Sequence, residues 1–246
     1  CFCNGGIGGE PGTYAEFAVV PQDQLARIPR GIDLQQAAAL PLVAITVCEA
    51  LFDRARLRRS DHVLIHAGAG GTGHVGIQLA RLAGAHVATT VSGPAKARLA
   101  DELGAERVIR YRQQDFVAEA RAWTGGRGLD VALDNVGPEV LLRTLRAMAP
   151  YGRIVTLMGV PGDDADGTAY NANLTLHNVM MLTPMWLGLR GRLRRQAGQV
   201  RKVLGWLAEK RLRIVIDQVF PLAKAAAAHR RLESGKALGK ILLSIS

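Results

Sequence analysis

The sequence predicts a doubly wound α/β fold, in which helices cover both faces of a parallel sheet. From Asp61 onward, short apolar strand patterns alternate with amphipathic helix patterns. The strands are apolar nearly throughout, as expected for strands that are buried on both faces. A glycine-rich turn follows the first strand, and Gly84, Gly104 and Gly128 stand where helices return to strands, the usual place for a left-handed cap.

The elements follow in a regular order along the chain. The expected strands are His62–Ala67, His86–Ser92, Arg107–Tyr111, Asp130–Asp134 and Arg153–Met158. The expected helices between them are Gly73–Ala83, Ala95–Leu103, Phe116–Trp123 and Glu139–Met148. Outside this sheet, we expect short strand-like character at Thr13–Pro21, a helix over Leu34–Leu51 bent near Pro41, a segment Ile214–Phe220, a helix at Lys224–Glu233 and a last strand at Lys240–Ser244.

The run from Val63 to Gly73 is the most informative local pattern. Gly68, Gly70 and Gly73 have the G-x-G-x-x-G spacing between an apolar strand and an amphipathic helix. Glycine permits the tight turn and lets the backbone approach a pyrophosphate, which the free amides of the helix start then bind. The run therefore predicts dinucleotide binding, with a bare structural turn as the alternative.

The end of the second strand bears on which dinucleotide is bound. An acid about 20 residues after the first glycine would bind the ribose 2′-hydroxyl of NAD. This chain has Thr89–Ser92 there, followed by Lys96 and Arg98. Because a 2′-phosphate meets no carboxylate and a cation can pair with it, the sequence favours NADPH over NADH. Ordinary helix-surface charge is the alternative for both cations.

Composition bounds the class of protein. The 246 residues, 48% hydrophobic and 21% charged, suit one large globular domain or two modest ones. No apolar run approaches the roughly 18 residues of a membrane span, so no membrane association is expected. Three cysteines give no disulfide framework, which favours a cytoplasmic location. The chain begins at Cys1 in mid-pattern, which indicates a fragment or a processed product.

The formal charge of +10 is concentrated near residues 190–213, where nine basic residues accompany the single acid Glu209. A polyanion surface is one interpretation. However, an apolar stripe at helical spacing leaves the basic residues on a solvated face, and no aromatic residues interleave with them as in RNA-binding motifs. Nucleic acid is therefore not the favoured partner. The stripe is Leu193, Ala197, Val200, Leu204 and Leu207, and the residues outside it include Arg194, Arg195, Arg201 and Lys202.

Several blocks in order resemble the medium-chain dehydrogenase/reductase superfamily, specifically its zinc-independent quinone oxidoreductase-like branch. They include Gly12–Phe17, Ala37–Leu42 with Thr46, Ala67–Gly73, Asp134–Gly137 and Gly239–Ile241. The resemblance covers essentially the whole chain. It implies a Rossmann domain at 41–212 that interrupts a GroES-like catalytic domain, of which 1–40 and 213–246 are parts. Family members carry further sequence before the equivalent of Cys1, so we expect a chain that is incomplete at its N-terminus and inactive as it stands if that part is essential.

The resemblance also implies a role for individual residues in cofactor binding. Gly71, Thr72 and Gly73 would hold the pyrophosphate, and Ser92, Lys96 and Tyr111 would surround the 2′-phosphate. Thr46, Asn135, Val136 and Gly159 would lie near the nicotinamide, and Lys240 would reach the cofactor from the last strand. For Tyr111, an aromatic residue that closes the core is the alternative.

No metal site is predicted. Where the zinc-dependent alcohol dehydrogenase branch has a cysteine ligand, this chain aligns Val43. Cys1 and Cys3 are too few for a tetrahedral site. His66 is expected to be a core histidine and His74 a histidine of the capping turn, so neither completes a ligand set.

These patterns together predict an NADPH-dependent oxidoreductase that transfers hydride to a quinone or conjugated carbonyl, a small electrophilic substrate, without zinc. An enoyl-thioester reductase of the same superfamily and a non-catalytic NADPH-binding protein with a basic partner-binding face are the alternatives. No catalytic residue is identified. The superfamily commonly dimerises through edge strands, so a homodimer is expected. The apolar stretch Asn178–Leu187 suits such an edge strand, a lid or plain core.

Overall fold

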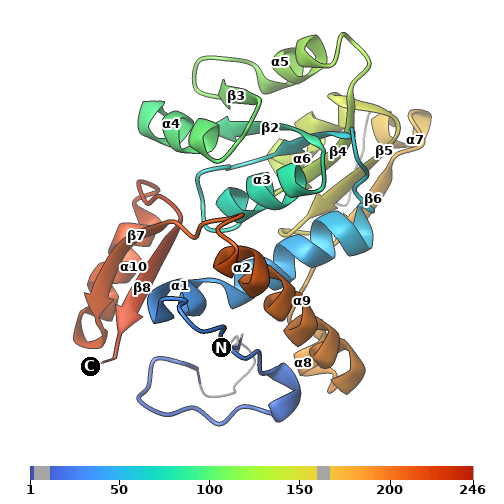
Figure 1. The fold of residues 1–246 in the computed structure, drawn as a ribbon. Coiled ribbons are helices and arrows are strands. Elements are labelled where there is room, and N and C mark those ends of the chain that lie inside the picture. The colour runs from blue at the N-terminus through green and yellow to red at the C-terminus, as the bar shows by residue number, and fades with distance from the viewer. Residues whose placement is uncertain (3–11, 160–166, 246) are drawn as a thin grey trace. The chain divides into compact units, whose positions relative to one another are not determined.

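The computed structural model describes residues 1–2, 12–159 and 167–245, and the chain divides into two compact units (Figure 1). One unit is Val47–Val179, and the other combines Cys1–Thr46 with Met180–Ser246. These units group residues 41–46 and 180–212 with the chain ends, whereas the predicted domain boundaries lie at 40 and 212; the division into functional domains stays a prediction. Within the described ranges no helix is long and apolar enough to cross a membrane.

The unit Val47–Val179 is built around a six-stranded sheet in the order β3-β2-β1-β4-β5-β6, in which every pairing is parallel. This is the strand order of a dinucleotide-binding Rossmann fold, so the predicted fold class is confirmed. The strands are β1 (His62–Ile65), β2 (His86–Val91), β3 (Arg107–Arg110), β4 (Leu129–Asp134), β5 (Met148–Thr156) and β6 (Thr175–Asn178). The helices are η2 (Cys48–Arg54, a π-helical segment), α3 (Gly73–Leu82), α4 (Pro94–Glu102), α5 (Phe116–Trp123), α6 (Pro138–Leu145) and α7 (Thr168–Asn171).

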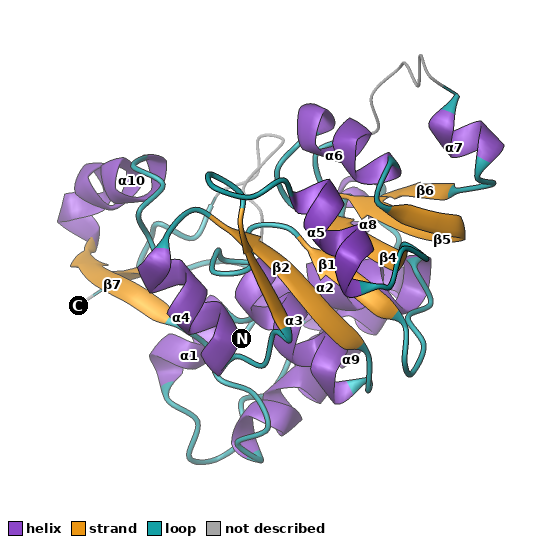
Figure 2. Cartoon of the chain, turned by 90° about the horizontal axis from the view of Figure 1, so that it is seen from above, coloured by secondary structure: helices purple, strands orange, loops and turns teal. Residues whose placement is uncertain are grey.

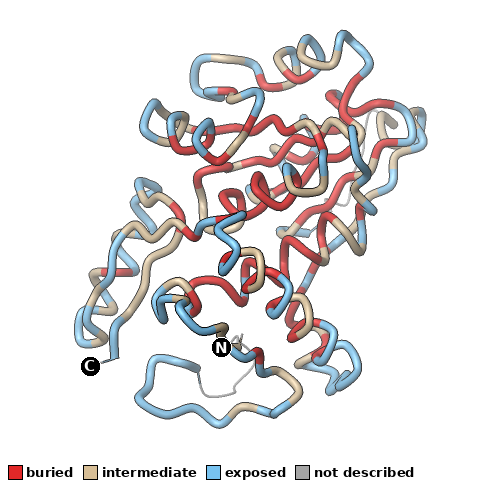
Figure 3. The backbone as a smooth tube through the Cα atoms, in the orientation of Figure 1, coloured by how far each residue is buried: buried red, intermediate tan, exposed pale blue. Residues whose placement is uncertain are grey.

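Helices cover both faces of this sheet because its central strands are apolar on both sides (Figures 2 and 3). Leu64 of β1 joins a buried cluster with residues of α5 and α6, among them Phe116 and Leu141. The next residue of the strand, Ile65, lies against Gly76 of α3. Successive side chains of a strand point to opposite faces, so α3 lies on the face opposite to α5 and α6.

Local signals explain where several elements begin and end. The Asp115 carboxylate accepts the amide of Val117 and caps α5, and Pro94 occupies the first turn of α4. The glycines expected as left-handed caps have positive φ angles of 82°, 96° and 94°, which confirms that prediction. They are Gly84, Gly104 and Gly128.

The other unit is described by itself. It contains η1 (Gln22–Gln24), α1 (Leu34–Ala39), α2 (Pro41–Val47), α8 (Thr183–Trp186), α9 (Arg190–Ala208), η3 (Leu222–Lys224) and α10 (Ala225–Glu233). Its sheet consists of β7 (Ile216–Pro221) and β8 (Lys240–Ser244), which pair in parallel. The predicted bend near Pro41 is confirmed, because α1 ends at Ala39 and α2 begins at Pro41.

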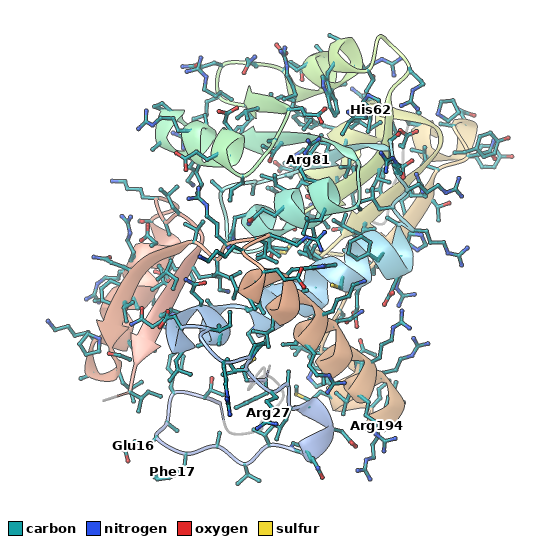
Figure 4. All side chains as sticks on the ribbon, in the orientation of Figure 1. Glu16, Phe17, Arg27, His62, Arg81 and Arg194 are labelled. Carbon is teal, nitrogen blue, oxygen red and sulfur yellow. The ribbon has the colours of Figure 1, made fainter. Side chains whose placement is uncertain are left out.

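The basic segment forms the amphipathic helix that the sequence predicts. The apolar stripe of α9 is buried, including Leu193 and Leu204, whereas the basic side chains are exposed. Figure 4 shows Arg194 projecting from α9, and its guanidinium pairs with Asp23 at 2.9 Å, as Arg190 does at 2.7 Å.

One expectation is wrong, and one alternative that the sequence left open is excluded. Residues 13–20 form no strand: Phe17 is 90% exposed, and its backbone pairs with no strand in the described part of the chain (Figure 4). The stretch Asn178–Leu187 is not an edge strand, because β6 ends at Asn178 and α8 follows at Thr183. Met181 and Leu182 of this stretch are buried, as plain core would be, whereas Met180, Trp186 and Leu187 are exposed.

Candidate functional site

The glycine turn after β1 brings backbone segments so close together that side chains cannot fit. A Cβ atom at Gly68 would overlap Thr89 Oγ1, and a Cβ atom at Gly73 would overlap the carbonyl oxygen of Ala67. A Cβ atom at Gly70 would lie 3.1 Å from that same oxygen. The predicted spacing of glycines is therefore a packing requirement of this turn.

Hydrogen bonds tie the turn to the start of α3. The amide of Gly70 donates to the carbonyl of Ala67 at 2.9 Å, and the amide of His74 donates to the carbonyl of Gly70 at 3.1 Å. The His74 ring nitrogen Nδ1 also lies 2.9 Å from that carbonyl, which confirms a histidine of the capping turn. Gly71 and Thr72 precede the helix and are partly exposed.

A small cavity of about 90 Å³ opens beside this turn, at the carboxyl ends of β1, β2 and β3. It brings together Ser92, Lys96 and Tyr111, the three residues assigned to the 2′-phosphate. Eight described residues line it, and none of these eight is acidic. They are Ala67, Ala69, Gly70, Thr90, Val91, Ser92, Lys96 and Tyr111.

The sequence left two interpretations open for Tyr111 and for Arg98, and the exposure and position of each residue bear on them. Tyr111 is 49% exposed, so it does not close the core. Arg98 is on the same helix as Lys96 but does not line the cavity, and it is exposed. Of the two cations, only Lys96 is placed to meet an anion there.

At the end of β4, Asp134 organises the next turn. Its carboxylate is buried, and Oδ1 accepts the amides of Val136 at 3.0 Å and Gly137 at 3.1 Å. Oδ2 accepts the hydroxyl of Thr156 at 2.9 Å. The carboxylate thus holds the turn through three hydrogen bonds. The side chain of Val136, within the turn, is 48% exposed.

Asn135 connects this turn to the glycine turn. Its Nδ2 donates to the carbonyl oxygen of His66 at 2.8 Å. Its Oδ1 is buried and accepts no hydrogen bond from the described residues. Gly159, which follows β5, has a φ of 90°, and no atom of the described residues lies within 4 Å of the position of a Cβ atom.

His66 is a core histidine, as predicted, and it is 1% exposed. Burial, assisted by the charge of Arg143, lowers its pKa to about 3. Its ring contacts the hydroxyls of Thr90 and Thr144 at 3.1 Å and 2.9 Å and meets the ring of Phe116 edge-on at 4.9 Å between centroids. The ring is therefore neutral at neutral pH.

Thr46 and Lys240 belong to the other compact unit. The Thr46 hydroxyl donates to the carbonyl of Leu42 at 2.8 Å within α2, and Lys240 opens β8. Their assignment to the cofactor stays a prediction.

The donor set does not fit a metal. No group of three or more His, Cys, Asp or Glu side chains that could hold an ion occurs in residues 1–2, 12–159 and 167–245. Val43 is buried in α2, and Cys1 and Cys48, the two described cysteines, are not joined by a disulfide. Cys3 lies outside the described residues.

Sequence reasoning missed the polar residues that support the site. Asp134 entered only as part of a motif, and Thr90 only as part of a stretch without acids. Thr144 falls within the expected helix Glu139–Met148 and has no assigned role there. A buried threonine within an apolar strand or on the apolar face of a helix is the signal that could have found Thr90 and Thr144, because a buried hydroxyl needs a partner.

Comparisons with known proteins agree with this geometry. The family model described as zinc-binding dehydrogenase matches residues 103–243. The chain is 31% identical to 2-haloacrylate reductase of a Burkholderia species over 94% of its own length and 70% of that protein. It is 30% identical to quinone oxidoreductase of Pseudomonas aeruginosa, over 96% of this chain and 72% of that protein.

A solved mycobacterial structure complexed with NADPH superposes with a TM-score of 0.84 at 28% identity, covering 94% of this chain and 71% of the other. The strand order, the family model and the identity to the two reductases all indicate the same family. The chain therefore belongs to the zinc-binding dehydrogenase family of the medium-chain dehydrogenase/reductase superfamily of oxidoreductases.

Proposed function

We propose that this chain binds NADPH and orients it for hydride transfer to a quinone or a conjugated carbonyl compound, without zinc. The cavity formed by Ser92, Lys96 and Tyr111 beside the glycine turn is the observation that carries the proposal. At about 90 Å³ it is far smaller than a pocket for a whole ligand, so it suits one group of the cofactor.

The electrostatics of the cavity favour a phosphate. A 2′-phosphate placed there would meet the ammonium of Lys96 and the hydroxyls of Ser92 and Tyr111. A carboxylate at the end of β2 would repel it, and none of the described lining residues carries one. The solved relative complexed with NADPH supports the same choice of cofactor.

The remaining residues of this unit would position the reacting end. Asn135 and Val136 lie where ligands of doubly wound sheets bind, at the carboxyl ends of the strands. The buried Oδ1 of Asn135 offers an acceptor that a donor group of a bound cofactor would satisfy. NADPH, when bound, supplies the hydride.

The choice of acceptor follows from the absence of a fitting metal site among the described side chains. Conjugation already activates a quinone or an enone, so neither needs a Lewis acid. The names of two relatives, 2-haloacrylate reductase and quinone oxidoreductase, support substrates of this kind. Assembly as a homodimer is part of the same proposal and rests on the superfamily resemblance.

The cofactor is tested by titrating the chain with NADPH and with NADH while following nucleotide fluorescence. We expect tighter binding of NADPH. The variant Lys96→Gln should weaken NADPH binding about 10- to 100-fold, the effect of losing a charge-assisted hydrogen bond, and should change NADH binding little. The matched control Arg98→Gln, on the same helix but outside the cavity, should bind like the wild type.

Tighter binding of NADH by the wild type would contradict the choice of cofactor, and equal effects of the two variants would contradict the place of the phosphate. Oxidation of NADPH by a quinone and by crotonyl-coenzyme A then separates the proposal from an enoyl-thioester reductase. The exposed arginines of α9 favour that second candidate, because they could meet the phosphates of coenzyme A.

A further inference from the structure

We propose that His66 is a positioning residue, whose Nε2–H tautomer orders a chain of hydrogen bonds from helix α6 to the backbone of the glycine turn. This inference rests on the proposed function, because the turn is where the cofactor would bind. The chain runs from the carbonyl of Val140 through Thr144, His66 and Thr90 to the amide of Ala67.

The direction of the first bonds follows from the donors available. The Thr144 hydroxyl donates its single hydrogen to the carbonyl oxygen of Val140 at 2.7 Å. Thr144 Oγ1 must therefore accept the bond that joins it to His66 Nε2 at 2.9 Å. The proton of the ring is thereby assigned to Nε2.

The remaining bonds follow from the neutral state of the ring. Burial keeps the pKa of His66 at about 3, so at neutral pH the ring carries one proton only, and Nδ1 is an acceptor. The Thr90 hydroxyl, 3.1 Å away, donates to Nδ1. Thr90 Oγ1 then accepts the amide of Ala67 at 3.2 Å. Each hydroxyl in this chain accepts one bond and donates one.

The chain ends on the backbone that shapes the candidate site. Ala67 has a φ of 53°, in the left-handed region that residues with a side chain rarely adopt. Ala67 and Thr90 both line the cavity beside Lys96. The carbonyl of Ala67 is also the oxygen that lies against Gly73. A fixed Thr90 rotamer therefore holds an unfavourable peptide conformation in the wall of the cavity before any ligand arrives.

The tautomer is the first test, because an Nδ1–H ring could neither donate to Thr144 Oγ1 nor accept from the Thr90 hydroxyl, as this chain of bonds requires. Nuclear magnetic resonance of the chain with ¹⁵N-labelled histidine reports which ring nitrogen carries the proton, and His66→Gln assigns the signal. We expect Nε2–H with an unprotonated Nδ1, unchanged between pH 5 and 8. An Nδ1–H tautomer, or titration within that range, would overturn the proposal without reference to any cofactor.

The second test measures NADPH binding in variants of the two hydroxyls. Thr90→Val should weaken NADPH binding about tenfold. Thr144→Val should weaken it only about threefold, because Thr144 is not among the described residues that line the cavity. Thr90→Ser keeps the hydroxyl and should restore binding to within about twofold of the wild type.

The matched control is Thr124→Val. The Thr124 hydroxyl also accepts a backbone amide, that of Gly128 at 2.9 Å, and donates to the carbonyl of Ala120 at 3.0 Å. It follows α5, where the chain returns to the amino end of β4. The thermal stability of the Thr124→Val variant should fall by as much as that of Thr90→Val. Its affinity for NADPH should equal that of the wild type.

The outcomes separate the two proposals. If the wild type binds NADPH and the Thr90→Val and Thr144→Val variants bind it equally well, the positioning role fails and the proposed function stands. If the wild type binds neither NADPH nor NADH, the proposed function fails and the positioning role with it, whatever the tautomer.

Discussion

The two ends of strand β1 carry histidines in opposite settings. His62, labelled in Figure 4, opens the strand and lies in a network of charged residues. Its ring stacks on that of His86 at 4.8 Å between centroids. His66 follows the strand and lies among uncharged hydroxyls. Two histidines four positions apart thus differ in their surroundings. His62 lies among partly exposed ion pairs where the strands begin, the amino edge of the sheet, and His66 lies in a buried hydrogen-bond network where the strands end, the carboxyl edge.

The charged groups of the amino edge are arranged as pairs. Arg127 pairs with Asp130 at 2.6 Å, and the amide of His62 donates to the same carboxylate at 2.8 Å. Arg81 and His86 both contact Glu106. Partly exposed pairs of this kind each contribute at most about 1 kcal/mol to stability, so this edge tolerates change. At the carboxyl edge, a buried polar group that loses its partner costs about 1–3 kcal/mol, and the same bonds shape the cavity. The carboxyl edge, which borders the proposed cofactor site, is therefore expected to be the more sensitive to substitution, and the amino edge the more tolerant.

The largest expected effect that separates the two edges is the response to acid. The pKa of His66 is about 3 when folded and about 6.5 when unfolded, so only the unfolded chain takes up this proton as the pH falls between these values. Above pH 6.5 this group does not change the free energy of unfolding. As the pH falls from about 6.5 to about 3, the free energy of unfolding decreases by about 1.4 kcal/mol for each pH unit. Chemical denaturation at pH 7, 5.5 and 4 should show a steeper fall for the wild type than for His66→Gln.

His62→Gln is the comparison at the other edge. Burial, and then the charge of His86, lower the pKa of His62 in the same direction, but its side chain is 26% exposed. Its removal should change the pH dependence less. Equal slopes for the wild type and His66→Gln would show that His66 is not held neutral in the folded state.

The next effect concerns backbone packing at the carboxyl edge. In Gly73→Ala the new methyl group would overlap the carbonyl of Ala67, which should lower the free energy of unfolding by about 1–3 kcal/mol and abolish NADPH binding. Gly205→Ala in α9 meets nothing within 4 Å and should stabilise the chain by up to about 1 kcal/mol. Thermal denaturation and nucleotide titration measure both. A Gly73→Ala variant that binds NADPH normally would remove the turn from the proposed site.

Local patterns were sufficient to predict much of the Val47–Val179 unit. The helix Phe116–Trp123 has the expected bounds, because an aspartate cap and an apolar period mark it within a few residues. By contrast, residues 13–20 alternate like a strand but pair with none in the described ranges, and a strand needs its partner. The sixth strand, Thr175–Asn178, is short and half exposed, so its apolar signal is weak.

Some residues of the candidate site could likewise be predicted from the sequence, and others could not. The spacing along one chain segment predicts Gly68, Gly73 and the cation Lys96 after the second strand, whereas Ser92 and Tyr111 were implied by the family resemblance. The bonds of His66 could not be predicted, since its partners are 24 and 78 residues away in sequence. A sequence pattern identifies a buried hydroxyl but does not say which ring it faces.

The smallest expected effect tests the amino edge directly. Burial alone would raise the pKa of Asp130, but the hydrogen bonds from Arg127 and from the His62 amide outweigh it and lower that pKa. Asp130→Asn should therefore lower the free energy of unfolding at pH 7 by about 0.5–1 kcal/mol. Because a carboxyl with a lowered pKa stabilises only while ionised, the difference from the wild type should vanish as the pH falls through the lowered folded-state pKa of Asp130.

NADPH binding by Asp130→Asn should equal that of the wild type, because Asp130 lies at the amino edge and the glycine turn at the other end of the same strands. Denaturation at pH 7 and pH 3, together with a nucleotide titration, measures both quantities. A loss of NADPH affinity without a matching loss of stability would mean that the two edges are coupled through the strands. In that case the amino-edge network would belong to the binding machinery as much as the hydroxyls around His66 do.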